Sequence, residues 1–258
     1  LEGKVVLVTG GSDGLGAALV RTLAAEGAKI AFCGRDDERL ASVEKSAEQL
    51  AASGGEAVAV KADVTSAEDM AGFVASAVER WGRLDALVNN AGQSAGSPVE
   101  SITDETWDYD LNLKLRAAIR TVRLAVPHLR AAGGGSIINV LAISGKAPGG
   151  GSAPSSVSRA AGLALTKALS KELGPDNITV NAILIGLVRS GQHRRRAEAA
   201  GRDVAEVYAQ MNAGANIPLR RIGEAEEFAD LAAFLVSERA RYISGVGINF
   251  DGGLSPVA

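Results

Sequence analysis

The chain has 258 residues, of which 47% are hydrophobic and 22% charged, a globular composition that excludes disordered, collagen-like and coiled-coil classes. The net charge of −3 lacks the basic surplus of a nucleic-acid-binding protein, and no apolar run approaches the ~20 residues that cross a bilayer. One cysteine cannot form an internal disulfide, and no cluster of cysteine and histidine predicts a metal site. We therefore expect a reduced, cytoplasmic protein that binds neither nucleic acid nor membrane.

Short apolar runs alternate with longer segments of helical period along the chain. Strands are predicted at Val5–Val8, Lys29–Cys33, Ala57–Lys61, Ala86–Asn89, Ser136–Leu141, Thr179–Ile183 and Gly247–Asn249. Helices are predicted over 15–26, 36–52, 66–80, 104–131, 155–173 and 224–237, with caps such as Asp36, Ser66 and Thr103. Strands separated by helices imply right-handed crossovers. The chain is therefore predicted to form one α/β domain over residues 1–258, a doubly wound parallel sheet in a Rossmann-like three-layer sandwich.

The segment from about residue 187 to 219 departs from this rhythm, because it is polar and helix-leaning and has no strand. It carries the basic run His193-Arg194-Arg195-Arg196. Ligands of doubly wound sheets bind outside the carboxyl ends of the strands, so a segment that follows the sixth strand would hang over that crevice. We predict a substrate lid here, and the alternative is a solvated helix with a basic face.

A glycine-rich turn joins the first predicted strand to the first predicted helix. It contains Gly10, Ser12, Asp13, Gly14, Leu15 and Gly16. Glycine allows a tight bend and brings bare backbone N–H groups against a pyrophosphate, whose charge the helix N-terminus favours. The strand–turn–helix context therefore predicts a nucleotide-binding turn rather than a turn that serves packing alone.

The spacing Gly10-x-x-x-Gly14-x-Gly16 resembles that of the short-chain dehydrogenase/reductase family, and further matches follow in order along the chain. They are Asp63-Val64 after the third strand, Asn89-Asn90-Ala91-Gly92 after the fourth, Asn112 within a helix, Ile185-Gly186-Leu187-Val188 after the sixth strand, and Asp251-Gly252-Gly253 near the end. The resemblance covers essentially the whole chain. It implies a nicotinamide nucleotide bound by the glycine turn and by Arg35, Asp63, Val64, Asn89, Ala91, Gly92, Arg159, Gly186 and Val188.

The residue that closes the second strand bears on the choice of nucleotide. Relatives that use NAD place an acidic residue there, whereas this chain has Gly34 followed by Arg35. A guanidinium at that edge can pair with a 2′-phosphate, so the resemblance favours NADP(H). The charge of Asp13 would repel that phosphate, and NAD(H) stays open as the alternative.

The family pattern fails at the reacting centre. The resemblance implies a serine, a tyrosine and a lysine at positions where this chain has Ala142, Ser155 and Arg159. An aliphatic hydroxyl is a poor general acid, and an arginine keeps the positive charge without relaying a proton. Asn112 matches the family's helix asparagine, and Ser144 is the nearest hydroxyl to Ala142. Asn112, Ser155 and Arg159 are thus the candidate catalytic residues.

Three functions remain open on these residues. The first is an oxidoreductase that acts on a carbonyl or alcohol through a rearranged proton donor. The second is a non-redox lyase or hydratase on the same fold, and the third is an inactive nucleotide-binding partner of an active paralogue. The basic lid hints at a small substrate that is anionic or linked as a thioester, and the resemblance implies a homo-oligomer, dimer or tetramer, built on the helices over 104–131 and 155–173.

Overall fold

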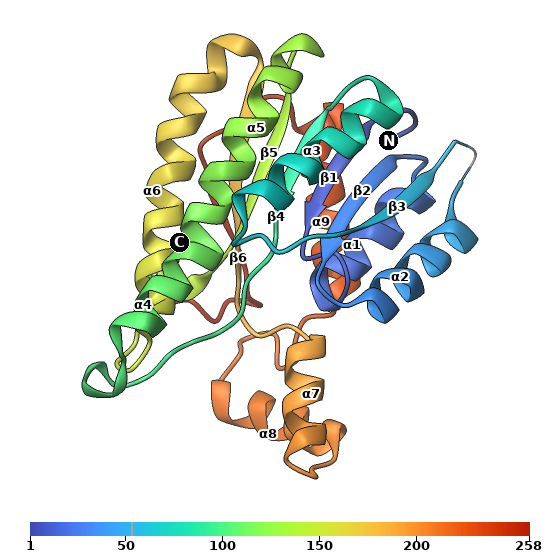
Figure 1. The fold of residues 1–258 in the computed structure, drawn as a ribbon. Coiled ribbons are helices and arrows are strands. Elements are labelled where there is room, and N and C mark those ends of the chain that lie inside the picture. The colour runs from blue at the N-terminus through green and yellow to red at the C-terminus, as the bar shows by residue number, and fades with distance from the viewer. Residues whose placement is uncertain (53) are drawn as a thin grey trace.

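In the computed structural model, which describes residues 1–52 and 54–258 apart from the side chains of Gln192, His193 and Arg196, seven parallel strands form one sheet (Figure 1). The strands are β1 (Val5–Thr9), β2 (Lys29–Gly34), β3 (Glu56–Lys61), β4 (Ala86–Asn89), β5 (Gly135–Ala142), β6 (Ile178–Ile185) and β7 (Gly247–Phe250). Their order is β3-β2-β1-β4-β5-β6-β7. The direction of the crossovers therefore reverses between β1 and β4, which makes this the switch point where a doubly wound sheet binds ligands.

Helices cover both faces of the sheet. They are α1 (Gly14–Ala25), α2 (Asp37–Leu50), α3 (Ala67–Trp81), α4 (Asp104–Leu111), α5 (Ala117–Ala131), α6 (Ser155–Leu173), α7 (Gly191–Ala199), α8 (Val204–Ala215) and α9 (Ala225–Val236). Figure 1 shows α7 and α8, in orange, projecting beyond the end of the sheet where β6 stops.

Alternating side chains of the strands feed two separate apolar cores. On β1, Val6 and Val8 pack in the core shared with α1, α2 and α9. Val5 and Leu7 point the other way, into the core shared with α3 and α5. This period of two on a strand that is buried on both faces explains why β1 reads as a continuous apolar run.

The predicted doubly wound parallel sheet is confirmed, and the predicted caps form as the sequence indicates. Asp36, Ser66 and Thr103 each accept a hydrogen bond from a backbone N–H in the first turn of the helix that follows. The predicted helix over 104–131 differs from the structure, because a π-helical turn over Asn112–Arg116 separates α4 from α5. Such turns insert one extra residue and reorient the side chains around them.

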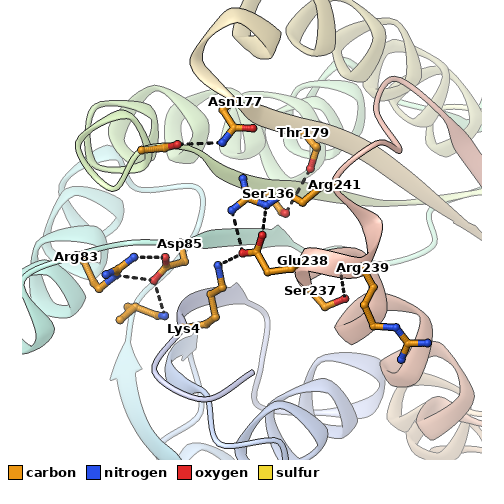
Figure 2. A network of polar contacts seen from close by, with 12 residues as sticks. Lys4, Arg83, Asp85, Ser136, Asn177, Thr179, Ser237, Glu238, Arg239 and Arg241 are labelled. Atoms are coloured by element: carbon orange, nitrogen blue, oxygen red, sulfur yellow. Dashed lines mark hydrogen bonds and ion pairs between the residues drawn. The ribbon is translucent and has the colours of Figure 1, made fainter.

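Charged side chains hold the amino ends of the strands, at the opposite edge from the switch-point crevice (Figure 2). The buried Asp85 carboxylate accepts hydrogen bonds from the Val5 backbone N–H at 2.9 Å and from the Arg83 guanidinium at 2.7 and 3.0 Å. Glu238 bonds to Lys4 and Arg241 nearby. These contacts stabilise the amino edge of the sheet, whereas the carboxyl edge is where the site forms. Among the described helices none is long and apolar enough to span a bilayer.

Candidate active site

A groove of about 770 Å³ opens at the carboxyl ends of the strands. The residues predicted to bind a nucleotide meet along this groove: Gly10, Ser12, Asp13, Gly14, Leu15, Gly16, Arg35, Asp63, Val64, Ala91, Gly92, Arg159, Gly186 and Val188. Asn89 is the exception, because its side chain is buried beneath the groove and donates to Asn139 Oδ1 at 2.9 Å. The groove is large enough for a dinucleotide's reactive end and a small substrate.

The glycine turn is shaped by close backbone contacts. Gly10 has a φ of +66°, which favours glycine, and a Cβ at Gly16 would run into the Gly10 carbonyl. Asn90 holds the turn by donating its amide to the carbonyls of Thr9 and Gly10 at 3.0 Å. The N-terminus of α1 therefore faces the groove with its N–H groups, as a phosphate site requires.

Two charged residues that were predicted to bind the nucleotide, Arg35 and Asp63, line the groove together. Arg35 Nη1 lies 3.5 Å from Asp63 Oδ2, and Tyr109 of α4 lies within hydrogen-bonding reach of the same guanidinium. Burial raises the pKa of Asp63, but hydrogen bonds from Thr65 and the charge of Arg35 outweigh burial, so the pKa lies below its usual value. The Asp63 carboxylate is therefore charged and held in place near neutral pH.

The reacting centre is built from the end of β5 and the start of α6. Ala142 and Ser144 line the groove at the end of β5, and Ser155 and Arg159 line it from the first two turns of α6. Ser155 Oγ accepts a hydrogen bond from the Ala95 backbone N–H at 2.9 Å and a second one from Lys114 Nζ at 2.6 Å. A serine oxygen has two lone pairs, so both are taken and the hydroxyl hydrogen is left to donate.

Lys114 is a candidate site residue that the sequence reasoning missed, because its Nζ bonds to Ser155 Oγ. The π-helical turn carries it inward, where it pairs closely with Asp110 one turn earlier, and Ser158 Oγ donates to the same carboxylate at 2.6 Å. Burial lowers the pKa of Lys114, and the charge of Arg159 acts in the same direction against the opposing hydrogen bond to Asp110. A signal was present, since Asp110 and Lys114 stand four residues apart on one helix face beside Asn112.

Arg159 lies between the reacting centre and the sheet. Its Nη1 donates to the Val140 carbonyl at 2.7 Å, which aims the guanidinium along the end of β5. Burial lowers the pKa of Arg159 to about 10, so the side chain stays protonated at neutral pH. It supplies a fixed positive charge rather than a proton.

The Asn112 side chain is held by Arg120. Its Oδ1 accepts from Arg120 Nη1 at 2.8 Å, and the same Arg120 nitrogen reaches the Thr65 carbonyl at 3.2 Å. The side chain therefore ties the π-helical turn to the loop before α3. Asn112 is not among the residues that line the groove, whereas Ser155 and Arg159 are.

The tyrosines do not replace the missing phenol. Tyr208 is buried in the lid, where its hydroxyl bonds to the N–H and carbonyl of Ser190, and Arg189 stacks 4.7 Å from the centre of its ring. Tyr242 is fully exposed. Tyr109 lines the groove at the end that holds Arg35.

The segment predicted to be a lid, called the lid segment from here on, forms α7 and α8. Ser190, Gly191 and Arg195 line the groove beside the glycine turn. The predicted absence of strands over 187–219 agrees with these helices. The side chains of His193 and Arg196 lie outside the described part of the chain.

Comparison with known proteins places the whole chain in one group of enzymes. A family model described as enoyl-(acyl carrier protein) reductase matches residues 10–255. The 3-oxoacyl-(acyl-carrier-protein) reductase of Thermotoga maritima is 33% identical over 254 residues and covers 98% of each chain.

Two solved structures extend this likeness. An L-sorbose reductase of Gluconobacter frateurii in complex with NADPH and L-sorbose superposes with a TM-score of 0.93 at 32% identity, covering 100% of this chain and 98% of its own. An NADPH-bound short-chain oxidoreductase of Pseudomonas aeruginosa, described as containing an atypical catalytic center, gives a TM-score of 0.91 at 38% identity, with 99% and 98% covered.

Proposed function

This chain belongs to the short-chain dehydrogenase/reductase family of oxidoreductases, and we propose that it is an NADP(H)-dependent reductase of a small carbonyl compound. In the proposed reaction, Lys114, Ser155 and Arg159 take the place of the family's serine, tyrosine and lysine. The observation that carries the proposal is the pair of hydrogen bonds to Ser155 Oγ. They leave one O–H to donate toward a substrate oxygen in the groove.

The residues present fit the cofactor. The N-terminus of α1 offers N–H groups to a pyrophosphate, Gly186 and Val188 line the groove on the facing side, and Arg159 offers donors for a ribose hydroxyl. When bound, NADPH supplies a hydride to the carbonyl carbon. A proton must then reach the carbonyl oxygen, and this chain's residues are arranged to deliver it.

The proton path runs from Lys114 through Ser155. As negative charge develops on the substrate oxygen, Ser155 donates its O–H proton to that oxygen and takes a proton from Lys114 Nζ along the existing 2.6 Å hydrogen bond. The product is an alcohol, and Lys114 ends neutral beside Asp110 until solvent reprotonates it. The lowered pKa of Lys114 makes it a stronger acid than an ordinary lysine. The fixed charge of Arg159 stabilises the developing oxyanion.

The proposed preference for NADP(H) over NAD(H) rests on Gly34, the last residue of β2, and on Arg35, which follows it. A Cβ at Gly34 would lie 2.5 Å from Ser12 Oγ, so the site has no room for the acidic side chain that would hold a free 2′-hydroxyl. Arg35 follows at the groove edge and can pair with a 2′-phosphate. The solved relatives that bind NADPH support the same choice.

The experiment is to follow NADPH oxidation by absorbance across a panel of ketones, ketoses and 3-oxoacyl thioesters, the last chosen because of the relative that reduces that class. Ser155→Ala keeps the buried ion pair intact and is expected to lower kcat by about 100-fold or more while the Kd for NADPH changes by less than about threefold. The exposed Lys171→Met on α6 is the matched control and should behave like the wild type.

A second variant tests Lys114 without leaving a buried charge unpaired. The double change Lys114→Met with Asp110→Asn removes both charges together, and we expect it to lose turnover as Ser155→Ala does while still binding NADPH. Full activity of either variant would overturn the proton path. The wild type could instead bind NADPH and reduce no carbonyl, while the triple change Ala142→Ser, Ser155→Tyr and Arg159→Lys gains activity. That result would favour an inactive nucleotide-binding partner. Consumption of substrate at constant NADPH would favour a lyase or hydratase.

A further inference from the structure

The first residue of the lid helix α7 touches the glycine turn. A Cβ at Gly191 would collide with the Asp13 carboxylate, and a Cβ at Gly14 would lie 3.4 Å from the Gly191 backbone nitrogen. The lid therefore docks on the turn at a point where only small residues fit. Asp13 lies at this junction and caps α1 by accepting from the Gly14 N–H at 2.7 Å.

Three arginines from two helices gather on the same carboxylate. Arg195 of α7 pairs closely with Asp13 Oδ2, Arg194 lies 3.9 Å from Oδ1, and Arg39 of α2 lies 3.8 Å from Oδ2. Two further carboxylates share them, since Asp36 lies 3.2 Å from Arg39 and Glu198 lies 3.9 Å from Arg194. The cluster is close to neutral as a whole.

Two of these arginines also line the cofactor groove. Arg39 and Arg195 line the same groove as Ser12, Gly34 and Arg35, near which the 2′-phosphate of NADP(H) is proposed to bind, and the Asp13 carboxylate between them directly follows Ser12 in the chain. Each guanidinium has five N–H donors, and a single carboxylate cannot saturate them. Both side chains are about half exposed, with 45% and 42% of their surface accessible, so they keep donors for an incoming anion.

We propose that Asp13 is a positioning residue that holds Arg39 and Arg195 as a clamp for the phosphate monoester on the adenosine 2′-oxygen. Because Arg195 belongs to the lid, the lid then contributes to the selectivity for NADPH over NADH. This inference rests on the proposed use of NADP(H). Two helices that are far apart in the chain, α2 and α7, meet on one carboxylate, and the phosphate then meets guanidinium groups already held in place. Preorganised donors bind more tightly because less conformational entropy is lost on binding.

The opposite expectation follows from charge alone. A carboxylate near a phosphate dianion repels it, so removing the charge of Asp13 would strengthen NADPH binding if Asp13 did nothing else. If Asp13 positions the arginines, removing its charge loosens them and weakens NADPH binding. The two accounts predict opposite signs for one substitution.

The test is the Kd for NADPH and for NADH, measured by nucleotide fluorescence on the full chain. Asp13→Asn keeps an N-cap side chain, so α1 remains capped. We expect it to raise the Kd for NADPH by about tenfold and the Kd for NADH by less than about twofold, because NADH has no 2′-phosphate. Arg195→Gln and Arg39→Gln should each reproduce this selective loss.

Asp203→Asn is the matched control, because Asp203 is also a helix N-cap, on α8, and lies outside the groove. It should leave both Kd values unchanged. Tighter NADPH binding by Asp13→Asn, or an equal loss for both nucleotides, would overturn the clamp and leave the proposed reductase standing. Failure of the wild type to bind either nucleotide would overturn both proposals, whereas binding without turnover would overturn the reductase alone.

Discussion

Ser155 stands where the family has a phenol, and the contacts of its oxygen are the basis of the proposed proton transfer. A serine hydroxyl alone is too weak an acid to protonate an alkoxide by itself. Because Lys114 donates to Ser155 Oγ at 2.6 Å, the hydroxyl needs only to hand over one proton as it receives another. On the proposed proton path, the acid strength of the site is set by Lys114.

The pH dependence of turnover should report Lys114. Carbonyl reduction needs the lysine protonated, so kcat/KM is expected to fall as the pH rises through a pKa below the usual lysine value of about 10.4, and alcohol oxidation should rise over the same range. Asp110→Asn removes the partner that raises this pKa, which should move the fall to lower pH. The measurement is a pH–rate profile in both directions, and a profile that does not move in Asp110→Asn would exclude Lys114 as the acid.

Lys114 also shows where sequence reasoning stops at this scale. Ala142, Ser155 and Arg159 were located from the resemblance alone, because the motif fixes their register along the chain. Lys114 belongs to no such motif, and its spacing of four residues from Asp110 predicts only an ion pair along one helix face, with no contact to Ser155. The contact with Ser155 spans 41 residues and exists only once α6 packs against the π-helical turn.

The elements were predictable where short-range chemistry decides them. Capping residues and apolar runs located every strand of the sheet and the starts of α2, α3 and α4 to within a residue or two. The π-helical turn over Asn112–Arg116 was not predictable, because its cause is tertiary: Arg120 ties Asn112 to the Thr65 carbonyl, and the Asp110–Lys114 pair is buried against α6. The part of the site that depends on this turn was therefore missed.

At the amino edge of the sheet, Asp85 should contribute strongly to stability. Its buried carboxylate satisfies the Val5 N–H and the Arg83 guanidinium, so Asp85→Ala is expected to lower the free energy of unfolding by about 2–3 kcal/mol. Glu238→Gln, in the exposed pair beside it, should cost less than about 1 kcal/mol. Urea unfolding measures both. Equal losses would mean that burial does not separate the two carboxylates.

Two exposed glutamates around α9 should make stability depend on acid pH. Hydrogen bonds from Arg221 and the Glu224 N–H lower the pKa of Glu227 to about 2, and bonds from Arg241 and Lys4 lower that of Glu238 to about 2. A carboxylate whose pKa is lower in the folded state stabilises the fold above its unfolded pKa, near 4.5, and this stabilisation is lost as the pH falls toward 2.

The double variant Glu227→Gln with Glu238→Gln is therefore expected to have a shallower fall in Tm between about pH 5 and pH 2 than the wild type. The measurement is a series of thermal melts across that range. The control is Glu2→Gln, because Glu2 is exposed and takes part in none of the ion pairs found among the described residues. An unchanged slope in the double variant would show that other carboxylates govern acid unfolding.

At the scale of the whole molecule, the groove joins parts of the chain that are distant in sequence. The glycine turn, the β4 and β5 ends, the start of α6 and the lid all contribute to its wall. A ligand that touches all of them binds only the folded state, so its binding energy adds to stability by mass action. Ile119 on α5 and Val157 on α6 expose apolar side chains on the helices that the resemblance implies for oligomer assembly. A homo-oligomer stays a prediction, and the molar mass measured by light scattering tests it.

NADPH at 100 times its Kd should stabilise the protein by about 2.7 kcal/mol, which corresponds to a rise in Tm of roughly 5–10 °C for a domain of this length.

Because the groove spans both halves of the sheet, the melt should stay a single transition when followed by circular dichroism and by the fluorescence of Trp81 and Trp107. Asp13→Asn should lose part of the NADPH shift and keep the NADH shift, since only the former uses the clamp. A rise in one probe without the other would mean that α3 and α4, which carry the two tryptophans, do not unfold together with the rest of the chain, and the nucleotide would then stabilise only the part that it touches.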